Sequence, residues 1–374
     1  MERVSSHLLT HGIIHSVTDP YAQAMLVRDG VIAWLGADDS ADRVADPSDA
    51  RMDLDGAVVV PAFVEPLARP EDVREALSRG TAVVTVLAGP DGAVPQADDV
   101  RTVAYRHADG ADADTAGVWL PVAPDADPGT LAALLAAATR AGEQAYLVPT
   151  ADEGAPGGPA TEEDAAAAQA AAVAALRRVA EELGAPALGR VRHRLVVTSP
   201  VSAEDRAFLA GAAVSATVTP AADGVLRAPV ASLLADAVPV ALGAGPGRDP
   251  WAAVRAALSH PDAAERVSAR SAFAAATRTP LRALPDTPAA GVAAAPRLAV
   301  SAPAVFGVWA ADAVAVQSPD GRVAAWSTDT RAGTPLLPAL DEETPLPRWR
   351  ATWVGGRVAA AAGPGDPPVA VDPA

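Results

Sequence analysis

Histidines and one glycine-rich run are the residues of this sequence whose types suggest chemistry. The chain has six histidines, and their spacings match no metal-binding motif. Five of them fall in predicted hairpins or helices, where we expect solvated surface positions: His7, His11, His15, His107 and His260. The sixth, His193, could serve as a metal ligand or as an acid–base group. Gly243-Ala-Gly-Pro-Gly247 follows a predicted strand, and backbone N–H groups in such a run could cradle a phosphate.

Several residue types that carry catalysis are missing. The sequence contains no cysteine and no lysine. This excludes disulfides, thiolate metal sites, a cysteine nucleophile, a Schiff-base lysine and a carboxylated lysine. No Gly-x-Ser-x-Gly segment occurs that would present a serine nucleophile. Asparagine is absent as well, and because Lys and Asn both have A-rich codons, we attribute the bias to a GC-rich genome.

Charge and hydropathy restrict the partners of the chain. The net charge of -17 disfavours binding to nucleic acids and to anionic membranes, since both need clustered Lys and Arg. Half of the residues are hydrophobic and a fifth are charged, as in soluble globular proteins. The first ten residues have no signal-peptide character, and no stretch reaches transmembrane length. We therefore expect a cytoplasmic protein.

The middle of the chain alternates between predicted strands and helices. The strand-like runs are Ala57–Val64, Thr81–Leu87, Val118–Val122, Tyr146–Val148, Arg190–Thr198, Val214–Val218 and Val238–Leu242. The helix-like runs between and after them include Pro70–Ser78, Gln96–His107, Pro128–Ala141, Ala203–Ala210, Pro229–Asp236, Asp249–Ser259 and Ala269–Thr277. This alternation predicts βα units and a parallel sheet.

The length of this middle part is close to that of a (β/α)8 barrel, which needs about 250 residues. The sequence shows seven convincing strands, however, where a barrel needs eight. Either the eighth strand lies near the Asp109–Asp114 loop or the barrel is incomplete. Both ends of the chain are instead rich in strand and turn signals, among them Asp29-Gly30 and Gly355-Gly356. We predict an α/β protein in which residues 57–296 form a TIM-like barrel and residues 1–56 and 297–374 form one composite β-sandwich.

Local sequences agree with this layout. Leu26–Gly36 has the form of an opening hairpin, and Asp53–Val64 that of a run-in to a first barrel strand. Arg190-Val-Arg-His193, Asp249–Val254 and Trp353-Val-Gly-Gly-Arg357 follow in the same order. Together these segments resemble the amidohydrolase superfamily, and in particular its YtcJ-like metal-dependent hydrolase branch. The resemblance implies a barrel with a composite β domain, and a divalent metal such as zinc as cofactor.

The metal-binding positions depart from that family. Leu67 and Arg69 stand where the family has His-x-His, and Gly245 stands where its metal-binding Asp would act as the base. Of the ligands that the resemblance implies, only His193 keeps its position. A catalytic zinc ion needs about three protein ligands, and an arginine in that space would repel the cation. We therefore predict that no metal is bound; the glycine-rich run would then be small residues that replaced a metal motif.

Four polar residues remain in the expected barrel mouth: Glu65, Arg69, Arg192 and His193. They suit an anion, or one another, better than a metal, so Arg69, Arg192 and His193 are the ligand-binding candidates. We predict a degenerate homologue, a pseudoenzyme without bound metal, which is inactive as a hydrolase. It would bind a small molecule or assist a partner, such as a second copy of itself or a full-length relative. The alternative is a hydrolase acting on non-peptide carbon–nitrogen bonds, with an unconventional catalytic site at His193 and Glu65.

Overall fold

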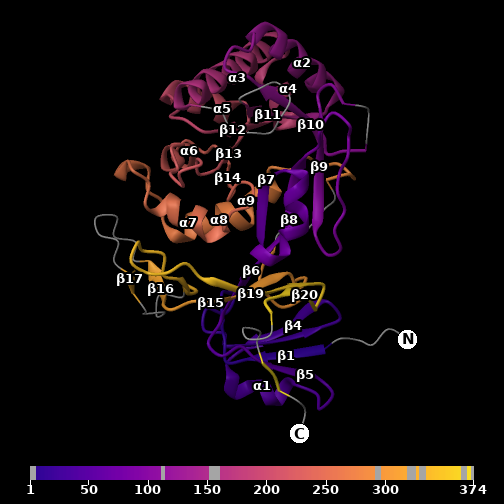
Figure 1. The fold of residues 1–374 in the computed structure, drawn as a ribbon, viewed down its shortest axis with the longest axis vertical. Helices are drawn as coiled ribbons and strands as arrows, with labels where there is room; N and C mark the ends of the chain where they lie inside the picture. The colour runs from indigo at the N-terminus through magenta and orange to yellow at the C-terminus, as the bar shows by residue number, and fades with distance from the viewer. Residues whose placement is uncertain are drawn as a thin grey trace.

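The chain folds into an eight-stranded barrel that stands on a β-sandwich, and the first and last described strands both belong to the sandwich (Figure 1). The computed structural model describes residues 6–110, 114–150, 161–290, 296–317, 326–327, 334–363 and 369–371. Residues 111–113 of the Asp109–Asp114 loop lie outside this description.

The barrel strands follow one another in sequence order. They are β7 (Phe63–Ala68), β8 (Thr81–Leu87), β9 (Arg101–His107), β10 (Gly117–Val122), β11 (Gln144–Pro149), β12 (Arg194–Val197), β13 (Ser215–Val218) and β14 (Val240–Leu242). Each strand pairs in parallel with the next, and β14 lies against β7. The barrel is thus nearly closed, which confirms the predicted α/β class and TIM-like architecture.

Both faces of these strands are covered, so several of them are buried along their whole length. Every residue of β8 and of β11 is buried, as expected for parallel strands between two apolar layers. Tyr105, Trp119 and Tyr146 pack inside the barrel, whereas Leu120 and Leu195 belong to the core outside it.

Helices cover the outside of the barrel. They are α2 (Pro128–Ala141), α3 (Glu162–Leu183), α4 (Ala185–Val191), α5 (Ala203–Gly211), α6 (Val230–Ala235), α7 (Pro250–Leu258), α8 (Ala269–Thr277) and α9 (Thr279–Arg282), with short 3-10 turns η1 (Pro70–Glu75), η2 (Leu77–Arg79) and η3 (Ala263–Glu265). Pro70–Ser78 thus forms 3-10 turns, where we predicted one helix. No helix in the described part of the chain is long and apolar enough to cross a membrane.

The eighth barrel strand is β9, in a segment that we predicted to be helical. The prediction for Gln96–His107 was wrong, because Val103, Tyr105 and His107 are buried in strict alternation with less buried residues. That period of two is the pattern of a strand. The strand ends directly before the Asp109–Asp114 loop, close to where the missing strand was expected.

The sandwich joins strands from both ends of the chain. One sheet has the order β21 (Val369–Val371), β5 (Ala50–Asp53), β1 (Ser6–Thr10), β3 (Ala24–Arg28) and β4 (Val31–Gly36), with α1 (Asp38–Val44) on it; the other has the order β2 (Ile13–Ile14), β6 (Val58–Pro61), β15 (Phe306–Ala310), β19 (Arg348–Val354) and β20 (Arg357–Ala361). Beside them lies a small sheet of β17 (Trp326–Ser327), β16 (Val314–Gln317) and β18 (Leu337–Pro338). Met25, Phe306 and Trp353 share one apolar core between the two large sheets.

Two hairpins of the sandwich confirm the predicted turns. Asp29 and Gly30 join β3 to β4 with φ values of 53° and 78°. Gly355 and Gly356 join β19 to β20 with φ values of 60° and 81°. Two successive positive φ values define the type I′ turn, whose twist matches that of the flanking strands.

Candidate functional site

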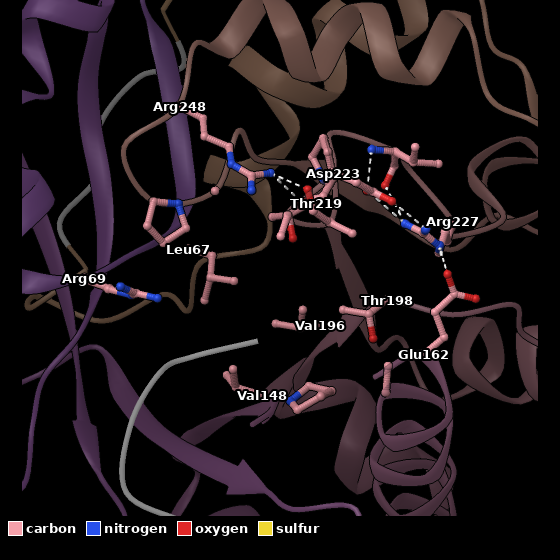
Figure 2. A pocket seen from close by; sticks show the side chains of 18 of the residues that line it. Leu67, Arg69, Val148, Glu162, Val196, Thr198, Thr219, Asp223, Arg227 and Arg248 are labelled. Atoms are coloured by element: carbon pink, nitrogen blue, oxygen red, sulfur yellow. Dashed lines mark hydrogen bonds and ion pairs between the residues drawn. The ribbon is translucent and has the colours of Figure 1, made fainter. Parts of the chain in front are cut away.

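The carboxyl ends of the barrel strands surround a cavity of about 550 Å³ (Figure 2). In a parallel barrel all these ends lie at one face, with the loops that follow them. The lining comprises Leu67, Ala68, Arg69, Leu87, Val148, Pro149, Thr161, Glu162, Ala165, Val196, Thr198, Thr219, Pro220, Ala221, Ala222, Asp223, Val225, Arg227, Gly245, Pro246 and Arg248. Small-molecule pockets commonly measure about 300–1,000 Å³, so this barrel mouth is the candidate site.

All three positions at which the sequence departs from the family's metal ligands border this cavity. Leu67 lies near the end of β7, Arg69 directly follows that strand, and Gly245 follows β14. Leucine and glycine offer no ligand side chain, and a guanidinium is a fixed cation without an acceptor. Among the described residues, no group of three His, Cys, Asp or Glu side chains is placed to hold a metal ion. The described residues at this mouth therefore do not fit a divalent metal.

The two carboxylates in the cavity lining are already paired with one arginine. Arg227 Nε lies 2.6 Å from Glu162 Oε1, and its Nη2 lies 2.7 Å from Asp223 Oδ2 (Figure 2). The hydrogen bond from Arg227 also lowers the pKa of Asp223 to about 2. Asp223 is thus ionised at neutral pH, and both carboxylates are oriented towards the same fixed cation.

Arg248 and Arg69 bring two further cations to the same cavity. Arg248 follows β14, and its Nη1 donates to the backbone oxygens of Pro220 at 3.0 Å and Ala221 at 2.5 Å. Arg69 follows β7 and enters from another side (Figure 2). Its Nη1 lies 3.8 Å from the exposed Glu71. The lining therefore holds three arginines against two carboxylates, although the whole chain is strongly acidic.

Glu65 lies at the seam between β7 and the end of β14, next to the cavity but not in its lining. Its Oε1 accepts a hydrogen bond from Leu67 N at 3.0 Å, and its Oε2 accepts one from Ala244 N at 2.9 Å. Burial raises the pKa of the Glu65 carboxyl to about 7, although these backbone N–H groups favour the ionised form. The group is bound to backbone on both oxygens.

The glycine-rich run after β14 has a packing reason. A Cβ on Gly243 would lie 2.5 Å from Glu65 Oε1 and 3.0 Å from Pro66 Cδ. Gly245 and Gly247 have left-handed φ values of 79° and 70°, which glycine adopts without strain. These glycines let the loop approach Glu65 and turn sharply, so they need no phosphate to explain them.

His193 lies at the amino end of the barrel, so our expectation that it lies in the barrel mouth was wrong. It directly precedes β12, beside the start of β11. Its Nδ1 accepts a hydrogen bond from Ala145 N at 3.0 Å. Its Nε2 lies 3.0 Å from Thr139 Oγ1, which donates its own hydrogen to Leu135 O at 2.7 Å. Nε2 must therefore carry the ring proton, and burial lowers the pKa of His193 to about 4. The ring is a neutral link between α2 and β11.

Arg192 is also at that end, and its expected place in the mouth was wrong for the same reason. Its guanidinium donates to Arg282 O at 3.2 Å and to Leu284 O at 2.9 Å, so it holds α9 across the bottom of the barrel. Its own carbonyl accepts from Gln144 Nε2 at 2.6 Å. Of the four predicted site residues, the structure places Arg69 in the cavity and Glu65 beside it.

Two other histidines are buried and a third is half-buried, although we expected all three at the surface. His107 lies inside the barrel with its ring 4.7 Å from that of Trp119, and His260 is 5% exposed. His15 Nδ1 donates to Leu336 O at 2.8 Å, and burial lowers the pKa of His15 to about 4. None of these three histidines belongs to a group of His, Cys, Asp or Glu that could hold a metal ion in the described chain.

Sequence reasoning missed the most unusual charged residue, Arg194 of β12. It is fully buried beneath the cavity, with its Cζ 4.0 Å from the ring centre of Tyr146 and 5.6 Å from that of Tyr105. Its Nη2 donates to Pro66 O at 3.2 Å and to Thr217 Oγ1 at 3.3 Å. Within the described chain no carboxylate lies within ion-pair distance of it. The sequence offered one signal for this burial. Arg194 lies two residues before Val196 in the same strand, so both side chains face the same side of the sheet.

Comparison with known proteins identifies the fold but no close relative. No protein-family profile matches the chain, and no curated protein sequence matches it. Many solved structures do match in three dimensions, over nearly the whole of both chains.

Three of these structures illustrate the likeness. An amidohydrolase from an environmental sample of the Sargasso Sea has a TM-score of 0.60 at 15% identity, covering 95% of this chain and 93% of its own. A Xanthomonas campestris adenosine deaminase with bound zinc has 0.59 at 13%, covering 98% and 94%. The N-isopropylammelide isopropylaminohydrolase of Burkholderia multivorans has 0.57 at 14%, covering 96% and 98%. The chain thus has the amidohydrolase fold, as its sequence predicted.

Proposed function

We propose that this chain is a small-molecule-binding protein on the amidohydrolase fold, and that it does not carry out metal-dependent hydrolysis. One observation carries the proposal. Leu67, Arg69 and Gly245 border the barrel-mouth cavity at the positions where the resemblance places metal ligands. The cavity is retained, whereas the groups that would hold a metal in it are replaced.

The replacement removes the chemistry as well as the metal. In metal-dependent hydrolases the ion lowers the pKa of a bound water enough for attack at neutral pH. A leucine and a glycine supply no ligand, and Arg69 adds a positive charge to the same space. The carboxylates that remain, Glu162 and Asp223, are held by Arg227. No described group at the mouth is placed to activate water in place of the metal.

The second candidate function is hydrolysis of carbon–nitrogen bonds with Glu65 as the acid–base group. A pKa of about 7 favours it, because proton transfer at neutral pH is most effective near that value. Two features weigh against it. Both oxygens of Glu65 accept backbone hydrogen bonds, and His193, the predicted co-catalyst, lies at the opposite end of the barrel.

Metal analysis and activity assays separate the two candidates. The protein is expressed in medium supplemented with Zn, Mn and Fe, and its metal content is measured by mass spectrometry. We expect far less than one equivalent, and no hydrolysis of a panel of amides, ureas and cyclic imides. A stoichiometric metal would overturn the proposal. Hydrolysis by the metal-free protein that is lost in Glu65→Gln would instead establish the second candidate.

Binding in the cavity is tested with a bulky substitution. A mixture of small organic compounds is screened by ligand-observed NMR against the wild type and Ala222→Trp, which places an indole at an exposed lining position. Ala264→Trp is the matched control, since Ala264 is an exposed alanine on η3, outside the lining. We expect binding to the wild type and the control and its loss in Ala222→Trp. Equal binding by all three proteins would contradict a role of the cavity.

A further inference from the structure

The cavity has an apolar wall and a cationic rim, which together restrict the chemistry of its ligand. Leu67, Leu87, Val148 and Val196 supply aliphatic side chains from four different strands. Arg248, Arg227 and Arg69 lie around these aliphatic side chains on different sides (Figure 2). A ligand that uses both would combine a hydrocarbon body with a negative group.

Arg248 is the arginine best prepared to receive that group. Its Nη1 is fixed by the carbonyls of Pro220 and Ala221. Its Nε and Nη2 make no hydrogen bond to the described part of the chain. Nε–H and Nη2–H form the side edge of the guanidinium, whose geometry matches the two oxygens of a carboxylate. Since the other nitrogen anchors the group in place, little freedom is lost when a ligand binds.

The charge balance favours a single negative charge on the ligand. Arg227 is paired with both carboxylates of the lining, and Arg69 lies near Glu71. One guanidinium edge of Arg248 therefore remains as the main positive site. The chain as a whole carries a net charge of -17, which repels polyanions at long range.

We propose that the barrel-mouth cavity binds a small organic monocarboxylate, with its carboxylate on the Nε and Nη2 edge of Arg248 and its apolar body against Leu67, Val148 and Val196. This inference rests on the proposed function, because it names the ligand class of the same cavity. It adds two claims, that the ligand is negatively charged and that Arg248 recognises it. Either claim can be wrong while the cavity still binds small molecules.

The test uses pairs of compounds with the same hydrocarbon body, one a carboxylate and the other its neutral amide of nearly the same shape. Ligand-observed NMR measures binding to the full chain of three pairs: benzoate and benzamide, phenylacetate and phenylacetamide, and hexanoate and hexanamide. Phenyl phosphate is added as a dianion for comparison. We expect each carboxylate to bind at least tenfold more tightly than its amide. Arg248→Gln should weaken the carboxylates about tenfold, the usual size of one charged hydrogen-bonding contact, and should leave the amides unchanged.

The matched control is Arg266→Gln. Arg266 also donates to a backbone carbonyl, that of His260 at 3.0 Å, but it lies outside the cavity. Its substitution should leave every affinity unchanged. Equal binding of carboxylates and amides, tighter binding of phenyl phosphate, or indifference to Arg248→Gln would each overturn the monocarboxylate assignment while the proposed function survives. Failure of all compounds to bind would overturn both.

Discussion

Glu65 accepts a hydrogen bond from the backbone N–H of Ala244 at 2.9 Å, and this contact ties the first barrel strand to the loop after the last one. The sheet ladder ends at β7 on one side and at β14 on the other. The carboxylate therefore closes the barrel at a place where, in the described chain, no strand pairing does so. Glu65 lies two residues before Leu67, and its role in closing the barrel does not depend on a metal.

Removing this side chain should destabilise the barrel. Glu65→Ala leaves the buried N–H groups of Leu67 and Ala244 without their acceptor, and each such loss costs about 1–3 kcal/mol. We expect the free energy of unfolding to fall by about 2–4 kcal/mol at pH 6, measured by urea denaturation. Glu71→Ala, on the exposed side of the neighbouring turn, should change it by less than about 0.5 kcal/mol. Equal effects of the two substitutions would contradict the role of Glu65 at the seam.

The same carboxyl should give stability a distinctive pH dependence. Its pKa is raised from 4.5 to about 7 in the folded chain, so the folded state binds the proton more tightly than the unfolded state. The stabilisation from Glu65 is then complete below about pH 4.5 and is lost as the pH rises through 7. His15 and His193, whose pKa values are lowered to about 4, act in the opposite direction between about pH 4 and 6.5.

A comparison with Glu65→Gln isolates the carboxyl, because the histidines contribute equally to both proteins. Between pH 8 and pH 5 the wild type should gain about 2–3 kcal/mol of unfolding free energy relative to the variant. Urea denaturation at several pH values measures this difference. A constant difference across that range would show that the proton on Glu65 does not affect folding.

The fold could largely be predicted from the sequence, because the order of apolar runs and turns fixes which elements are buried. The Asp29-Gly30 turn and the β8 run are examples in which local chemistry dictates the structure. The segment ending at His107 was misassigned because its alternation of Val103, Tyr105 and His107 is short and its flanks look helical. The end of α4 could not be predicted for another reason. Glycine usually marks a helix end of this kind, but here Arg192 adopts the left-handed φ of 58°.

The site could be predicted only where it follows a strand end directly. Leu67, Arg69 and Gly245 lie near the ends of predicted strands, and the resemblance to the amidohydrolases implied their place at the barrel mouth. His193 was misplaced because the predicted strand, Arg190–Thr198, began too early. The observed strand β12 begins at Arg194, and only residues from Val196 onwards line the cavity. The roles of Arg248 and Arg194 depend on partners far away in the sequence, which composition and spacing do not reveal.

His193 should affect stability but not ligand binding. His193→Ala leaves the Ala145 N–H without an acceptor and creates a cavity, so we expect a loss of about 2–4 kcal/mol. His193→Asn keeps a side-chain oxygen acceptor and should lose less. Affinities for small molecules should stay within about twofold of the wild type in any variant that remains folded. A folded His193 variant with impaired binding would place this residue in the functional site after all.

The stacking of Arg194 on Tyr146 should be measurable as a coupling energy. A guanidinium on a desolvated aromatic face is worth about 2 kcal/mol, and the 4.0 Å approach in the barrel interior meets that condition. We expect Tyr146→Leu to cost more than Tyr146→Phe, which keeps the ring and loses the hydrogen bonds of the hydroxyl, among them the one to Pro66 O. In a double-mutant cycle with Arg194→Met, unfolding free energies should give a coupling of about 1–2 kcal/mol. Because Arg194 has no carboxylate partner in the described chain, its own replacement by methionine should cost less than breaking a buried ion pair, roughly 3–5 kcal/mol. Additive effects of the two substitutions would mean that the aromatic face does not hold the buried charge, and that the carbonyl of Pro66 and the hydroxyl of Thr217 do so alone.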